Sequence, residues 1–204
     1  MGREGMFTAI GTLALGLVLA APPAAEAQER SGIKVGIGGG LGSSTLTCGD
    51  CPEGEREMGG SAYFTVGYHV SPRVRLGVDG NVWTKTYEFD ELDADATANL
   101  YTVVGSVTFY PAARGGFFLK GGVGGAFVNM DFDADGSTLS ADLGRGMGYL
   151  AGAGYDIRIS PRVAITPAVN VWAGQPGSLK LLGETLFRDA RFNVVDFTIG
   201  VTFP

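Results

Sequence analysis

The sequence predicts an all-β protein, an eight-stranded antiparallel up-and-down transmembrane β-barrel. Eight segments alternate apolar and polar residues with a period of two, which gives a strand one apolar and one polar face. Short and long connections alternate between these segments, and the chain opens with an export signal. These three features together are typical of barrels that cross the bacterial outer membrane.

The first 27 residues are expected to be a signal peptide. Arg3 precedes a largely apolar run over residues 6–21, and Ala25-Glu26-Ala27 forms a cleavage site of the small-x-small type. The run is too short to indicate a transmembrane helix. We therefore expect residues 28–204 to form one outer-membrane β-barrel domain.

Each predicted strand places apolar side chains at every second position, as a strand with one lipid-facing side requires. The predicted strands are 32–41, 61–70, 73–87, 98–110, 116–132, 147–159, 162–173 and 192–203. In that order, their apolar faces hold Val35, Ile37 and Leu41; Phe64, Val66, Tyr68 and Val70; Val74, Leu76, Val78 and Val82; Tyr101, Val103, Val107 and Phe109; Phe117, Leu119, Val123 and Phe127; Tyr149, Ala151, Ala153, Tyr155 and Ile157; Val163, Ile165, Val169 and Val171; and Val195, Phe197, Ile199, Val201 and Phe203.

The opposite face of the strands carries many glycines and only one or two charges per strand, whereas a soluble exterior would be about a quarter to a third charged. We therefore expect this face to line a lumen, which in an eight-stranded barrel is just wide enough for side chains to fill. The large side chains expected to fill it are Trp83, Trp172, Phe118 and Tyr110. The charges expected to pair inside are Arg75, Lys120 and Arg158 with Asp79, Asp156 and Asp196. The same face holds Lys34, Tyr63, Thr65, His69, Asn81, Ser106, Thr166 and Asn170.

The connections between the predicted strands alternate in length. Those at 71–72, 111–114 and 160–161 are tight, and those at 42–60, 88–97, 133–146 and 174–191 are long. Outer-membrane barrels have short periplasmic turns and longer extracellular loops, so both termini are expected in the periplasm. Pro167 falls within a predicted strand, and its missing N–H predicts a bulge or local distortion there.

An internal repeat relates the two halves of the chain. Residues 71–74, Ser-Pro-Arg-Val, return at 160–163, and residues 81–83, Asn-Val-Trp, return at 170–172 with the same offset. The repeat is consistent either with a duplicated half-barrel or with a shared solution to one turn.

With its eight alternating strands and the aromatic Phe203 in the closing strand, the chain resembles the small eight-stranded outer-membrane barrels, the family of the OmpA transmembrane domain and OmpX. The resemblance implies a monomer of porin-like architecture surrounded by outer-membrane lipid and lipopolysaccharide. It also implies that the barrel-assembly machinery reads the last strand through Phe203, although Pro204 follows that residue here.

Cys48 and Cys51 lie in the first long connection. In an exported protein we expect them to form a local disulfide. A thioredoxin-like redox site would need a βαβ context, and a zinc site would need further ligands.

An enzyme of this shape would modify lipid A, and the resemblance to such enzymes would require a His with a nearby Ser and an acidic partner. His69 and Ser71 lie together at a tight turn with no acidic residue beside them. We therefore expect both to be interior or turn residues.

Asp131, Asp133, Asp135 and Asp142 have the spacing of ligands at positions one, three, five and twelve of an EF-hand loop, with Gly136 at position six. Position twelve is usually Glu, and strands rather than helices flank this segment. The alternatives are a calcium site and a solvated acidic loop.

The last long connection is unusually apolar. We expect it to extend the neighbouring strands, to fold over the barrel mouth, or to bind a partner. Its apolar residues are Leu179, Leu181, Leu182, Leu186 and Phe187.

The charge of the chain excludes a nucleic-acid-binding surface, since 15 Lys and Arg stand against 21 Asp and Glu and the net charge is −6. The sequence favours a non-catalytic outer-membrane protein without a cofactor, acting structurally or through its extracellular loops. A narrow passive diffusion channel is the main alternative, and a lipid A-modifying enzyme is the third.

Overall fold

The computed structural model describes residues 31–49, 55–89, 94–134, 137–181 and 184–203. These residues form nine strands and no helix long and apolar enough to cross a membrane. The strands are β1 (Gly32–Thr47), β2 (Glu57–Ser71), β3 (Val74–Phe89), β4 (Ala94–Phe109), β5 (Phe117–Ala134), β6 (Ser137–Tyr155), β7 (Ile157–Ser160), β8 (Val163–Leu181) and β9 (Glu184–Phe203).

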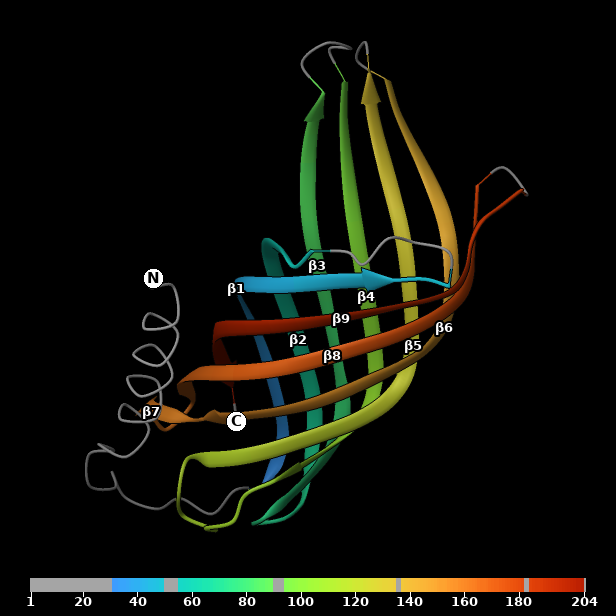
Figure 1. The fold of residues 1–204 in the computed structure, drawn as a ribbon. Coiled ribbons are helices and arrows are strands. Elements are labelled where there is room, and N and C mark those ends of the chain that lie inside the picture. The colour runs from blue at the N-terminus through green and yellow to red at the C-terminus, as the bar shows by residue number, and fades with distance from the viewer. Residues whose placement is uncertain (1–30, 50–54, 90–93, 135–136, 182–183, 204) are drawn as a thin grey trace, which may run out of the picture.

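The strands close into a barrel. β1 to β6 pair antiparallel in chain order, β9 pairs with β1 and β8, and β6 pairs with β8 to close the sheet. β6 and β7 both pair with β8 and follow one another along it, so they form a single barrel strand. The fold is therefore the predicted eight-stranded antiparallel up-and-down barrel (Figure 1).

The interruption between β6 and β7 lies opposite Pro167. The ladder to β8 runs as far as the pair Gly154–Ala168 and resumes at Ile157–Ile165. Proline has no N–H to donate across the ladder, so the distortion expected at this position appears on the facing strand. Asp156 lies in the gap, with its side chain buried in the lumen.

The register of the strands agrees with the predicted faces. Val107 and Val123, on the predicted apolar face, are 50% and 53% exposed and point outward, as a lipid-facing surface requires. The four large aromatic residues expected inside are all buried: Trp83, Trp172, Phe118 and Tyr110.

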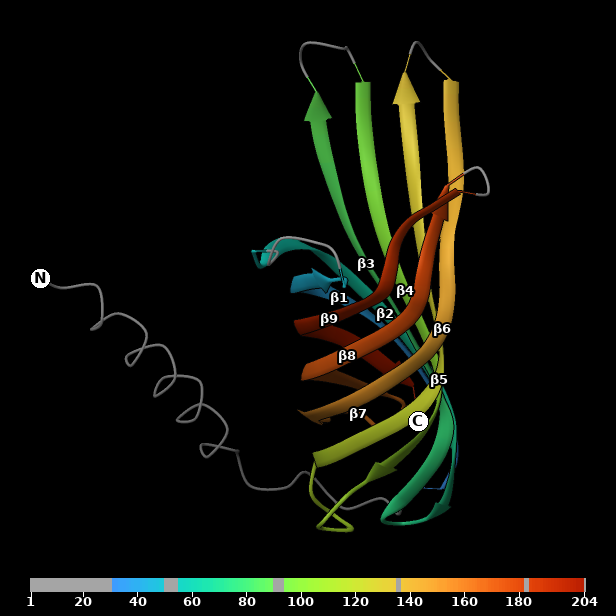
Figure 2. The same ribbon diagram turned by 45° about the vertical axis from the view of Figure 1, so that its right-hand side comes forward.

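All four predicted long loops are wrong in extent. β1 and β2 remain paired to Ser44–Glu57. β3 and β4 remain paired to Phe89–Ala94, β5 and β6 to Ala134–Ser137, and β8 and β9 to Leu181–Glu184. The β3–β4 and β5–β6 hairpins rise above the rest of the wall (Figures 1 and 2). We call this extension, residues 84–89, 94–99, 129–134 and 137–143, the arm.

The polarity of the sheet reverses at the base of the arm, and this reversal explains why the sequence pattern suggested loops. The change occurs at the row of paired residues Trp83, Leu100 and Val128. Below this row the outward side chains are mainly apolar, as at Tyr101 and Phe127, although Arg145 is exposed beside Phe127. Above it the outward positions are polar: Thr84, Asn99 and Asn129 in the next row, then Thr86, Thr97 and Asp131.

The inward face of the arm is largely apolar, and its polar members Lys85 and Tyr87 both contact Glu57. Ala96 is buried there, and Met130 and Ala141 pack against a cluster of buried apolar side chains that fills the upper lumen. The outward polar residues bond to one another, with Thr86 and Thr97 hydroxyls 2.9 Å apart and Asn99 donating to Asp131 at 2.8 Å. The arm is therefore a water-exposed sheet, whereas the wall below it is lipid-exposed.

Arginine at Val107 or Val123 should lower the free energy of unfolding by about 2–4 kcal/mol, because both positions face lipid near the middle of the membrane. Arginine at Ser140, which is exposed in the arm, should cost no more than about 1 kcal/mol. Urea titrations of refolded protein measure all three variants. Equal losses at the three positions would show that the assignment of lipid-facing strands is wrong.

Candidate functional site

The interior of the barrel is arranged in three tiers. Tyr110, Phe118 and Ala168 form a small cluster near the tight turns. A polar tier lies above them, and the larger apolar cluster closes the upper end. That upper cluster comprises Trp83, Leu100, Val104, Ala126, Val128, Leu143, Leu150, Trp172, Leu179, Ala190, Phe192 and Val194.

A buried ion pair joins opposite walls in the polar tier. Lys34 Nζ of β1 lies 2.5 Å from Asp156 Oδ2, and both side chains are almost completely buried. Asp156 also accepts hydrogen bonds from Tyr110 at 3.0 Å and from Thr166 at 2.9 Å. The Asp156 carboxylate, at the strand break opposite Pro167, therefore has three hydrogen-bond donors.

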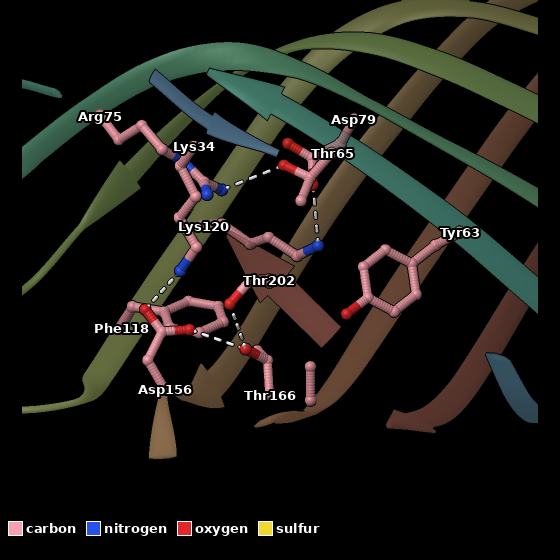
Figure 3. A pocket seen from close by; sticks show the side chains of 11 residues that line it. Lys34, Tyr63, Thr65, Arg75, Asp79, Phe118, Lys120, Asp156, Thr166 and Thr202 are labelled. Atoms are coloured by element: carbon pink, nitrogen blue, oxygen red, sulfur yellow. Dashed lines mark hydrogen bonds and ion pairs between the residues drawn. The ribbon is translucent and has the colours of Figure 1, made fainter. Parts of the chain in front are cut away.

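A second ion pair lies higher in the same tier. Lys120 Nζ of β5 is 3.0 Å from Asp79 Oδ1 of β3 (Figure 3). Ser106 donates to the other oxygen of Asp79. Arg75 instead donates to two hydroxyls, Thr65 at 3.2 Å and Thr108 at 2.9 Å. Burying a pair of charges is tolerated only where such additional hydrogen bonds satisfy both partners.

Asp196 is held by neutral groups alone. It accepts hydrogen bonds from Ser61 at 3.0 Å, Asn81 at 3.2 Å, Asn170 at 2.7 Å and Trp172 at 3.0 Å. Asn81 and Asn170 occupy equivalent positions in the two copies of the sequence repeat. The repeat therefore brings two amides from opposite parts of the chain onto one carboxylate.

The turns of the repeat are also equivalent. Ser71 Oγ accepts the backbone N–H of Arg73 at 3.3 Å, and Ser160 Oγ accepts that of Arg162 at the same distance. Each serine therefore stabilises its own tight turn, which is the role that hydroxyl side chains commonly take there.

The predicted interior charges are confirmed in part. Asp79 pairs with Lys120 as expected, whereas Asp156 pairs with Lys34, which had been placed inside but not assigned a partner. Asp196 has hydrogen-bond donors rather than an ion pair among the described residues. Arg158, expected inside, is only half-buried in β7.

The space left in the polar tier is small. One cavity of about 10 Å³, measured as the space open to the centre of a water molecule, is lined by residues of both ion pairs (Figure 3). A volume of this size holds about one water molecule. The side chains beside the two ion pairs therefore leave little open space.

His69 and Ser71 do not form a catalytic arrangement with each other. The His69 ring is buried, and its centroid lies 5.6 Å from the centroid of the Tyr110 ring. Ser71 Oγ accepts backbone hydrogen bonds from Arg73 and Val74 and thus serves the turn.

The acidic segment after residue 130 is a hairpin rather than a twelve-residue loop. Asp131 pairs with Ser140 and Asp142 with Asn129, with a register shift beside that pair. Asp135 lies outside the described residues. In the part of the chain that the structure describes, no three His, Cys, Asp or Glu side chains are grouped as a metal site would require.

The β8–β9 hairpin closes the upper lumen at its base. Leu179 and Ala190 are buried in the upper apolar cluster, and the ladder between the two strands shifts register around Gly177. Gly177 and Asp189 have positive φ angles of 75° and 52°, which mark the bend. Phe187 remains partly exposed, and the side chains of Leu181, Leu182 and Leu186 lie outside the described residues.

Comparison with known proteins agrees with this architecture. A family described as outer membrane protein beta-barrel domain matches residues 11–170. Ail, the attachment invasion locus protein of Yersinia pestis, is similar in structure with a TM-score of 0.53 and 16% identity over 85% of this chain and 100% of that one. Neisserial surface protein A, NspA, gives a TM-score of 0.54 and 17% identity over 85% and 97% of the two chains. No curated protein sequence matches the chain.

Lys120→Met should lower the free energy of unfolding by about 3–5 kcal/mol, because it leaves the Asp79 carboxylate buried without its cation. The matched control is Lys85→Met. Lys85 lies 3.5 Å from Glu57 in a pair with partly exposed side chains, and its loss should cost about 0–1 kcal/mol. Adding Asp79→Asn to Lys120→Met should recover part of the loss, and similar losses for the two single variants would contradict this assignment.

The disulfide between Cys48 and Cys51 stays a prediction, since Cys51 lies outside the described residues. Cys48 packs against the upper apolar cluster, just after the end of β1. Mass spectrometry of protein alkylated without reductant should find neither thiol labelled in material from oxidising cells. Replacing both with Ser should leave stability almost unchanged, because so short a loop removes little chain entropy. Label on both thiols would contradict the pairing.

Proposed function

This chain belongs to the outer membrane protein β-barrel domain family, and we propose that it acts there as a non-catalytic protein with a closed lumen and an extracellular interaction surface. The observation that carries the proposal is the filling of the polar tier. Two ion pairs cross the lumen, and the cavity beside them has room for about one water molecule.

The same observation argues against a diffusion channel. A solute would have to separate Lys34 from Asp156 and Lys120 from Asp79, each pair almost completely buried. It would then have to displace the apolar cluster around Trp172, whose side chain is fully buried. Each step exposes charges or apolar surface without compensation.

The arm supports the interaction role. Its outward face is polar although it continues strands that are apolar below, so it is suited to water outside the membrane. With the tight turns and both termini in the periplasm, the arm lies outside the cell, above outer-membrane lipid and lipopolysaccharide that contact the apolar wall. In this proposal the protein is a monomer, and the barrel-assembly machinery reads the strand ending at Phe203.

The charge of the arm bears on the kind of partner. Its described outward charges are acidic, at Glu88, Asp95, Asp131 and Asp142. One structure of Ail contains the heparin analogue sucrose octasulfate. A polyanion of that kind would be repelled by the acidic arm of this chain, whereas a cationic partner surface would be attracted.

Refolded wild-type protein in planar bilayers should show no steady conductance of nanosiemens size, because the two ion pairs and the upper cluster occupy the lumen. Trp172→Ala is the matched variant, since it removes the largest fully buried side chain, and its conductance should exceed that of the wild type. A stable nanosiemens conductance of the wild type would refute the closed lumen.

A further inference from the structure

Tyr63 places a buried hydroxyl in the cavity of the polar tier. The residue is 7% exposed, and its hydroxyl has no hydrogen-bond partner among the described residues. Two paired glycines make room for the ring. A Cβ at Gly38 would lie 2.5 Å from Tyr63 Cε1, and one at Gly200 would lie 2.1 Å from the hydroxyl. A buried donor left unsatisfied is costly, so this position indicates a ligand that accepts a hydrogen bond from the hydroxyl.

The carboxylates around the cavity already have donors. Both oxygens of Asp79 accept, one from Lys120 and one from Ser106. Both oxygens of Asp156 also accept, from Lys34 and Tyr110 at one oxygen and from Thr166 at the other. A metal cation would therefore have to compete with existing hydrogen bonds for every carboxylate oxygen.

Donors, in contrast, are in excess. The Lys120 ammonium carries three protons and gives one to Asp79, and the Arg75 guanidinium carries five N–H groups and gives two hydrogen bonds, both to hydroxyls. The cavity is lined by three cations, Lys34, Arg75 and Lys120, against two carboxylates. The third interior carboxylate, Asp196, lies outside the lining and has four neutral donors of its own.

We propose that this cavity binds one small monovalent anion of the halide class, chloride in the cell, accepting from the Tyr63 hydroxyl and the Lys120 and Arg75 cations. An anion satisfies the buried hydroxyl and also accepts from the spare N–H groups of Lys120 and Arg75, whereas a neutral water molecule gains less from those two cations. The cavity of about 10 Å³ excludes larger anions.

Bromide is the direct probe. Crystals of the refolded wild-type protein grown in sodium bromide should give an anomalous peak in the lumen within hydrogen-bonding distance of Tyr63 Oη. An ordered water there, without anomalous signal, would overturn the proposal.

A second measurement compares urea midpoints in sodium chloride and sodium gluconate at equal ionic strength, since gluconate is too large for the cavity. At a chloride concentration ten times the dissociation constant, the equilibrium constant for folding should rise about elevenfold in the wild type. Tyr63→Phe keeps the ring and removes the hydroxyl, so the chloride dependence should fall. Tyr68→Phe makes the same change on the lipid face of β2 and should keep the full dependence. An equal response of all three proteins would refute the site.

Discussion

The hydrocarbon layer offers no water to the peptide groups, and every other feature of this protein follows from that constraint. Each strand within the membrane must pair on both sides, so the sheet has to close, and it does so through β1 with β9 and β6 with β8. Closure over eight strands leaves an interior only as wide as its side chains. Pro167 cannot donate to the ladder and lies opposite its interruption between β6 and β7, and the Asp156 side chain at the interruption becomes part of the interior network.

A narrow interior in turn fixes how polar groups can be accommodated there. Lys34 and Lys120 each lie against a carboxylate, and Asp196 is surrounded by four neutral donors. These contacts connect strands that are distant in the sequence. Several of these strands do not share a backbone ladder. The apolar cluster around Trp172 also connects such strands nearer the arm. Interior side chains thus connect the walls of the barrel across its lumen.

Period-two alternation was sufficient to predict the eight strands, their lipid face and the four buried aromatic residues, because lipid on one side imposes a strict pattern. The partner of Asp156 could not be predicted, since which residues face one another across the lumen depends on the stagger of the strands. The arm was mistaken for loops for a different reason. Above the row of Trp83 and Leu100 the alternation continues with its sense reversed, and a search for outward apolar residues ends there. The continued alternation of polar and apolar residues, whichever kind faces outward, would have predicted the arm better.

The polarity reversal also fixes how deeply the barrel can sit. If the barrel moved toward the arm side, Tyr101 and Phe127 would leave the hydrocarbon for water, and if it moved the other way, Asn129 would enter hydrocarbon with its amide desolvated. Both displacements are opposed, so the polarity boundary holds the barrel at one depth in the membrane. Its lipid-facing run in β4, from Tyr101 to Phe109, agrees with the roughly 9–11 residues that a tilted strand needs to span the layer. A thicker membrane would have to thin around this wall, and the outer membrane, thinner than most, matches it without that deformation.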